Sequence, residues 1–208
     1  MFILIGTLIL TLIMFYLFQF VKLYKKAYSQ KVIKKNLLFS FGSNSIKQLK
    51  LRLNIKDELT YFNAYIKDNI RIFAGISKKW NNGGVASIYP SKGNNVYGIA
   101  VELSDIEMSI LDAFENGYTR NEMKCIIADK EYSCFAYIKT NHEFKNFPST
   151  DYLKAINCML NNRYVDNERK ILIKGIVKGK PINFGYWTDK EGLLLKLNNN
   201  VNVKCKNL

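Results

Sequence analysis

The sequence contains little histidine and has no cysteine pair at metal-binding spacing. His142 is the only histidine, and no C-x-x-C pair occurs among the four cysteines, Cys125, Cys134, Cys158 and Cys205. A structural zinc site is usually built from four Cys or His ligands at short spacings, so we expect no bound metal. The cysteines are typical of free thiols in a reducing compartment, although their even number leaves disulfides open.

Charged side chains are missing from Met1–Val21, which is almost wholly apolar. Such a run is long enough to cross the hydrocarbon core of a membrane. Residues 22–35 follow it with six lysines and no acidic residue, and a lysine-rich flank stays on the cytosolic side. We therefore predict a transmembrane anchor over 1–21, a basic juxtamembrane linker over 22–35, and a single-pass membrane protein whose domain faces the cytosol.

A cleaved secretory signal is the alternative interpretation of this apolar run. The run is longer than the core of a signal peptide, and no basic segment precedes it. No small-x-small cleavage site lies near Tyr24–Tyr28. These features favour the uncleaved anchor, with the membrane as a partner.

Acidic residues are few, 17 against 31 basic ones, which gives the chain a formal net charge of +14. Proteins that bind nucleic acid carry such an excess. Here the lysines are dispersed and no nucleic-acid module is recognisable, so we predict no nucleic-acid partner. We interpret the charge as an aid to solubility and as attraction to an anionic membrane surface.

The hydrophobic pattern beyond the linker predicts a domain of strands and helices over 36–163. Strands are expected over 36–41, 61–74, 123–128 and 133–139, with a hairpin formed by 85–89 and 96–103 about a turn at 90–95. Helices are expected over 46–53, from the capping box of Ser104 and Glu107 to about residues 115–117, and from Pro148 onward. The helix that the capping box starts should be amphipathic, with Ile106, Ile110, Leu111 and Phe114 at helical spacing. The last helix should bury Tyr152, Leu153, Ile156, Met159 and Leu160. Residues 164–208 form a C-terminal extension of uncertain structure, with short strands at 171–177 and 193–197.

The segment Leu38–Asn44 is the first candidate for a binding site. In it an apolar strand ends in Gly42-Ser43-Asn44, directly before an expected helix. Such a turn gathers free backbone N–H groups at one point, and glycine permits close approach of a ligand. The turn could hold an oxyanion or a carboxylate, although most turns of this kind only reverse the chain.

Glu115 is the second candidate. It follows Phe114 at the C-terminal end of the helix that the capping box starts, where the helix dipole disfavours a carboxylate. A carboxyl group placed there beside an apolar ring could carry a proton in catalysis. The alternative is that Glu115 caps a surface helix in solvent.

Six motifs stand in one order along residues 36–162. They are Phe39-x-Phe41-Gly42-Ser43-Asn44, Gly83-Gly84-Val85-Ala86-Ser87-Ile88, Val96-Tyr97-Gly98, Leu111-Asp112-x-x-Glu115, Tyr137 on an aromatic strand, and Pro148-Ser149-x-x-Tyr152. In this order and at these spacings they resemble the gamma-glutamylcyclotransferase family. Three places depart from the family pattern. Phe41 stands in place of tyrosine, Asn116 in place of glycine, and Met159-Leu160-Asn161 where the family often has Met-Gly-Ala.

The resemblance implies an α+β fold, a small, mostly antiparallel β-barrel with flanking helices, here preceded by the transmembrane helix. It implies an enzyme of the carbon–nitrogen lyase type that needs no cofactor. The substrate would be a γ-glutamyl amide, such as a γ-glutamyl amino acid, which cyclises to 5-oxoproline and releases the amine or amino acid. The oligomeric state stays open, with a homodimer among the options.

The resemblance also implies the roles of individual residues. Glu115 matches the family's acid/base. The substrate-binding positions are Leu38, Phe39, Ser40, Phe41, Gly42, Ser43, Asn44, Tyr137 and Tyr152. The alternative function is a non-catalytic, membrane-anchored binding or scaffolding module with the same fold.

Overall fold

The computed structural model describes residues 13–22, 35–160, 170–188 and 192–194. The chain divides into two units, Met1–Lys34 and Lys35–Leu208. In the first unit, residues 13–22 form a helix.

Within the described residues, no helix combines the length and the apolar character that a membrane crossing requires. The predicted transmembrane helix is therefore wrong, and so is the single-pass, cytosol-facing membrane localisation that depended on it. Residues 1–12 of the predicted anchor lie outside the described residues, as do residues 23–34 of the predicted linker.

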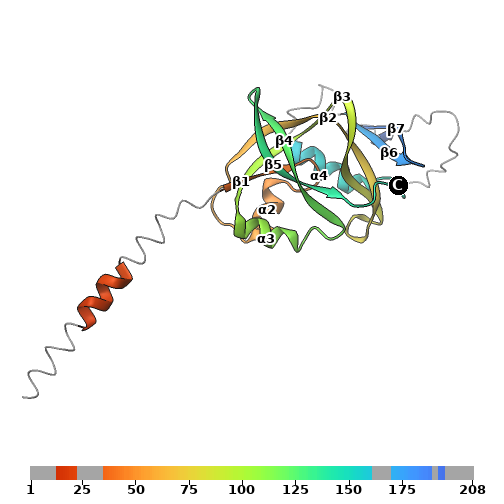
Figure 1. Ribbon diagram of the computed structural model, residues 1–208. Coiled ribbons are helices and arrows are strands. Elements are labelled where there is room, and N and C mark those ends of the chain that lie inside the picture. Colours follow the sequence, from red (N-terminus) through yellow and green to blue (C-terminus); the bar gives the residue numbers. More distant parts are fainter. Residues whose placement is uncertain (1–12, 23–34, 161–169, 189–191, 195–208) are drawn as a thin grey trace, which may run out of the picture. The chain divides into compact units, whose positions relative to one another are not determined.

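Five strands of the second unit close into a barrel in the order β1-β3-β2-β4-β5. Figure 1 labels these five strands. The strands are β1 (Lys35–Ser40), β2 (Tyr61–Ser77), β3 (Gly83–Ser104), β4 (Tyr118–Ile127) and β5 (Lys130–Lys139). Neighbouring strands run antiparallel, except that β1 and β5 pair in parallel through Leu38 and Phe135. The sheet-dominated α+β architecture that the resemblance implied is present, without the transmembrane helix.

Three helices accompany the barrel, namely α2 (Ile46–Leu53), α3 (Asp105–Asp112) and α4 (Thr150–Leu160). The Ser45 side chain caps α2, whose residues Leu49 and Leu53 are buried. The capping box predicted at Ser104 and Glu107 is formed at the start of α3. The five residues predicted for the buried face of α4 are those that it buries. Local apolar spacing was sufficient to predict the buried residues of α2 and α4, and the capping box was sufficient to locate the start of α3.

The predicted hairpin around residues 90–95 is wrong. Residues 83–104 form one long strand, β3, which pairs along β2 with a register shift between Lys67 and Asn69. The Pro, Gly and Asn residues of 90–95 make an irregularity in this strand, where Gly93 has a φ of +80° and donates its N–H to Asp68. These turn-forming residues therefore produce a bulge in the strand and do not reverse the direction of the chain.

The helix α3 is shorter than predicted, and of its predicted apolar face it buries Leu111 but not Ile106, Ile110 or Phe114. It ends at Asp112 and buries Met108 and Leu111. Ile106 is 70% exposed, and Phe114, beyond the helix end, is 49% exposed. A helix of two turns carries too few residues for apolar spacing to define one face, so contact with the barrel decides which residues are buried.

The C-terminal residues form a three-stranded sheet of β6 (Lys170–Val177), β7 (Lys180–Thr188) and β8 (Gly192–Leu194). The strand predicted at 171–177 is present, and residues 195–197 of the other predicted strand lie outside the described residues. Side chains of β6 and β7 join the buried cluster that fills the barrel, namely Ile171, Ile173, Phe184 and Trp187. The sheet therefore packs on the same core as the barrel.

Candidate active site

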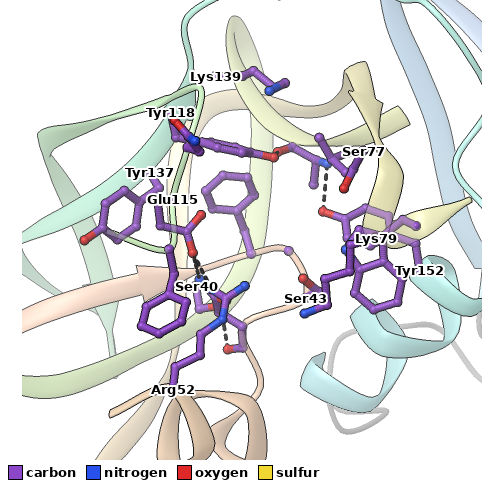
Figure 2. Close-up of a pocket in the computed structure, with 18 of the residues that line it drawn as sticks. Ser40, Ser43, Arg52, Ser77, Lys79, Glu115, Tyr118, Tyr137, Lys139 and Tyr152 are labelled. Carbon is purple, nitrogen blue, oxygen red and sulfur yellow. Dashed lines mark hydrogen bonds and ion pairs between the residues drawn. The ribbon is translucent and has the colours of Figure 1, made fainter. Parts of the chain in front are cut away.

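The ten residues proposed as catalytic or substrate-binding all line one cavity of about 260 Å³. The cavity wall comes from the C-terminal ends of β1, β2 and β5 and from the first residues of β3 and β4. These ends lie together, because β1, β2 and β5 run in one direction and β3 and β4 in the other. The site therefore lies at one end of the barrel, and Figure 2 shows its side chains.

The loop after β1 is fixed from both sides. The Ser40 hydroxyl donates to the Asn44 carbonyl at 2.8 Å. From outside the cavity, Arg71 Nε donates to the Phe41 carbonyl at 2.9 Å. Burial lowers the pKa of Arg71 to about 10. Because the C=O and N–H of a trans peptide point in opposite directions, the Gly42 N–H is turned away from Arg71.

Glu115 lies in the turn that follows α3, where its N–H donates to the Asp112 carbonyl at 3.2 Å. Its carboxylate accepts two hydrogen bonds on Oε1, one from Arg52 Nη1 at 2.6 Å and one from Asn44 Nδ2 at 3.0 Å. Arg52 Nη1 also donates to Asn44 Oδ1 at 2.9 Å, and its guanidinium lies 5.4 Å from the centre of the Phe114 ring. The carboxylate is thus held in one orientation, with a side chain that is 11% exposed.

Tyr152 joins the start of α4 to the loop after β1. Its hydroxyl oxygen accepts from the Ala86 N–H at 2.8 Å. A Cβ atom added to Gly42 would meet this oxygen at 3.2 Å, so the loop approaches it closely because residue 42 is glycine. Burial raises the pKa of Tyr152, although the Ala86 N–H opposes the shift. The phenol is therefore protonated at neutral pH and can donate its hydrogen.

Tyr137 lines the cavity with its ring, whereas its hydroxyl is used elsewhere. The hydroxyl donates to Asp112 Oδ1 at 2.8 Å. Burial and then this bond to Asp112 raise the pKa of Tyr137. Figure 2 shows the ring beside Glu115, with the oxygen directed away from it. In this geometry Tyr137 shapes the wall and offers no hydroxyl to a substrate.

Eleven residues of the wall were not proposed as site residues from the sequence. Five of them carry a cationic or a polar aromatic side chain, namely Arg52, Lys79, Trp80, Tyr118 and Lys139. Lys139 could have been found, because it stands two residues after Tyr137 on one strand and alternate residues of a strand share a face. No local pattern marks Arg52 or Lys79, which reach the cavity only through the fold.

No group of three or more His, Cys, Asp or Glu side chains in the described part of the chain could hold a metal ion. Three of the four cysteines, Cys125, Cys134 and Cys158, are free thiols there. Cys205 lies outside the described residues. The polar groups that line the cavity include one carboxylate, three cations and the phenols of three tyrosines.

The chain is similar to known proteins in both sequence and fold. The sequence profile of the family described as gamma-glutamyl cyclotransferase, AIG2-like, matches residues 38–154. The gamma-glutamylcyclotransferase of Mus musculus is 31% identical over 134 residues, which cover 59% of this chain and 68% of the mouse protein. Its Homo sapiens counterpart is 28% identical over 132 residues, with the same coverage of each chain.

A solved structure entitled "Gamma-glutamyl cyclotransferase" superposes on this chain with a TM-score of 0.56 and 28% identity. The superposition covers 62% of this chain and 79% of that one. Every residue that lines the cavity lies within the range that the family profile matches.

Proposed function

The chain belongs to the gamma-glutamyl cyclotransferase, AIG2-like family, and on that premise we propose that it cyclises a γ-glutamyl amino acid to 5-oxoproline. The observation that carries this proposal is the placement of Glu115, the loop Gly42–Asn44 and Tyr152 around one cavity. The reaction needs a proton carrier, an oxyanion site and a fixed, bent substrate. The three elements can supply these functions.

Glu115 starts the proposed reaction by taking a proton from the α-ammonium group of the substrate. Among the described residues, both hydrogen bonds to its side chain are made to Oε1, by Arg52 and Asn44. We assign proton uptake to Oε2. A carboxylate held by one oxygen presents the other in a fixed direction, which favours a positioned general base.

The freed amine then attacks the γ-carbonyl carbon of the same substrate molecule. A new carbon–nitrogen bond closes the five-membered ring, and the carbonyl oxygen becomes an oxyanion. Backbone N–H groups of Gly42–Asn44 are assigned to this oxyanion and to the α-carboxylate. The Phe41 carbonyl, held by Arg71, keeps the adjoining Gly42 N–H in place.

The intermediate collapses when the original carbon–nitrogen bond breaks. Glu115 returns its proton to the leaving nitrogen, and the second proton of the ring nitrogen passes to the released amine, so the enzyme ends the cycle unchanged and no water is consumed. The products are 5-oxoproline and a free amino acid. Tyr152 donates its phenolic hydrogen toward the substrate, while Ala86 holds its oxygen in position.

Arg52 acts as a positioning residue in this mechanism. It makes an ion pair with Glu115 and does not need to touch the substrate. Its second bond, to Asn44, connects the carboxylate to the loop that is assigned to the oxyanion. The acid/base group and the oxyanion site are thus fixed relative to one another.

Incubation of the full chain with a panel of γ-glutamyl amino acids, γ-glutamylamines and larger γ-glutamyl peptides tests this proposal. Mass spectrometry should detect 5-oxoproline and the released amino acid in equal amounts. If a γ-glutamyl compound binds, as measured by calorimetry, and no 5-oxoproline forms from any of the panel, the protein is a binding module and the proposed activity is wrong.

A further inference from the structure

The cavity wall carries more positive than negative charge. Three of its residues are cationic, Arg52, Lys79 and Lys139, and one, Glu115, is acidic. Arg52 is paired with Glu115, so the two lysines account for the excess of two positive charges. In the proposed reaction Glu115 interacts with the ammonium group of the substrate, but no substrate group is assigned to the two lysines.

Both lysines are held at the cavity by groups other than carboxylates. Lys139 Nζ lies 4.6 Å from the centre of the Tyr118 ring and 3.5 Å from the Gly117 carbonyl oxygen. Lys79 Nζ lies 5.3 Å from the centre of the Trp80 ring. In the described part of the chain, no ion pair includes either lysine.

The electrostatic environment of the lysines favours an anion beside them. Burial lowers the pKa of Lys79, and the Arg52 charge lowers it further, while Glu115 opposes both. Burial also lowers the pKa of Lys139, and the negative charge of Glu115 again opposes this shift. A negative ligand group near these ammonium ions would offset the hydration that they have lost.

We propose that Lys79 and Lys139 bind carboxylates of the residue that the reaction releases, so that the preferred substrate is a γ-glutamyl peptide with an acidic released residue. The inference rests on the proposed function. At neutral pH γ-glutamyl-glutamate carries three carboxylates and one ammonium group, an excess of two negative charges. One carboxylate is assigned to the loop Gly42–Asn44, which leaves two for the two lysines.

A comparison of γ-glutamyl-glutamate with γ-glutamyl-glutamine tests the proposal. The two dipeptides have nearly the same size and shape and differ in one carboxylate. Their dissociation constants are measured by calorimetry at low salt on the full chain with Glu115→Gln, in which we expect turnover to be about 10²–10⁴-fold slower. A charge pair between partly exposed groups contributes modestly to binding. We therefore expect γ-glutamyl-glutamate to bind about fivefold more tightly than γ-glutamyl-glutamine.

Variants of the lysines then show whether they cause the preference. The double variant Lys79→Gln and Lys139→Met, in the same background, should bring the ratio of the two dissociation constants close to one. The matched controls are Lys78→Gln and Lys130→Met, which change exposed lysines outside the cavity and should leave the ratio unchanged. Equal binding of the two dipeptides, or a preference that survives the double variant, would overturn the proposal.

Turnover by the wild-type chain separates this proposal from the proposed function. Equal kcat/KM for the two dipeptides would mean that the substrate proposal is wrong while the cyclotransferase function stands. Tighter binding of γ-glutamyl-glutamate without any 5-oxoproline would mean that the proposed role of the lysines stands and the cyclotransferase function is wrong. The lysines would then be a carboxylate-binding site in a protein that does not catalyse the reaction.

Discussion

Arg52 Nη1 donates to Glu115 Oε1 at 2.6 Å, a contact between side chains that lie 63 residues apart in the sequence. The bond joins the last turn of α2 to the turn after α3. Both side chains are mostly buried, with 17% of Arg52 and 11% of Glu115 exposed. The contact therefore fixes the carboxylate that is assigned to proton transfer.

Replacement of Arg52 by methionine should lower kcat more than it changes KM, because Arg52 positions Glu115 without touching the substrate. A hydrogen bond to a charged group is worth about 1.5–3 kcal/mol, which corresponds to a loss of roughly ten- to a hundredfold. Arg52→Lys should recover part of the rate. Steady-state kinetics measure both effects.

The matched control for this variant is Lys50→Met on the same helix. Lys50 pairs with Glu58, whose side chain is 89% exposed, and such surface pairs contribute little. We expect wild-type kinetics for the control. A wild-type kcat in Arg52→Met would contradict the positioning role.

Substitution of Gly42 separates the loop backbone from its side chains. Gly42→Val should lower turnover by at least 10²–10³-fold, the approximate cost of losing one oxyanion donor, because its side chain would crowd Tyr152 and block the substrate. Phe41→Tyr leaves the backbone groups in place and should change activity modestly or raise it. Circular dichroism checks that both variants are folded, and near-normal turnover of folded Gly42→Val would place the oxyanion site elsewhere.

Tyr152→Phe should destabilise the fold by about 1–3 kcal/mol, because the buried Ala86 N–H loses its acceptor. The change in the free energy of unfolding is measured by urea titration. Tyr132→Phe is the control, since Tyr132 is 41% exposed and should be close to neutral. Equal stabilities of the two variants would show that the bond to Ala86 contributes nothing.

Alkaline pH should destabilise the wild-type chain through the same tyrosine. Burial raises the pKa of Tyr152 in the folded state, so above the ordinary value of about 10 the unfolded chain loses a proton that the folded chain keeps. Its stabilisation is therefore fully present below about pH 10 and is lost as the pH rises further. Urea titrations between about pH 9 and 11 should give a shallower decline for Tyr152→Phe, by up to roughly 1.4 kcal/mol per pH unit. Equal slopes of stability against pH in the wild type and in Tyr152→Phe would contradict the raised pKa of Tyr152.

Local sequence signals predicted much of the fold. The spacing of Leu49 and Leu53 identified α2, and Ser104 with Glu107 identified the start of α3. These features depend on residues three or four apart, which interact within one turn of helix. The resemblance carried by the six motifs then identified ten site residues, and in the structure all ten line the same cavity.

What the sequence could not predict depends on contacts between distant segments. Nothing near Arg52 in the chain marks it as the partner of Glu115, since only the packing of α2 beside α3 brings them together. Gly93 and its neighbours are residue types that favour turns. Because β3 pairs with β2 on both sides of them, they form a bulge within the strand instead of a hairpin turn. The apolar run 1–21 has the composition of an anchor, but within the described residues no helix is both long and apolar enough to cross a membrane.

The most direct test of the account is the rate of 5-oxoproline formation by Glu115→Gln. Glutamine has the size of glutamate and can still accept hydrogen bonds from Arg52 and Asn44, but it cannot carry the proton. With γ-glutamyl-alanine and γ-glutamyl-glutamate as substrates, the account predicts a fall of about 10²–10⁴-fold relative to wild type, in a variant with an unchanged circular dichroism spectrum. Turnover within a few-fold of wild type would contradict it, because Glu115 would then have no part in the reaction.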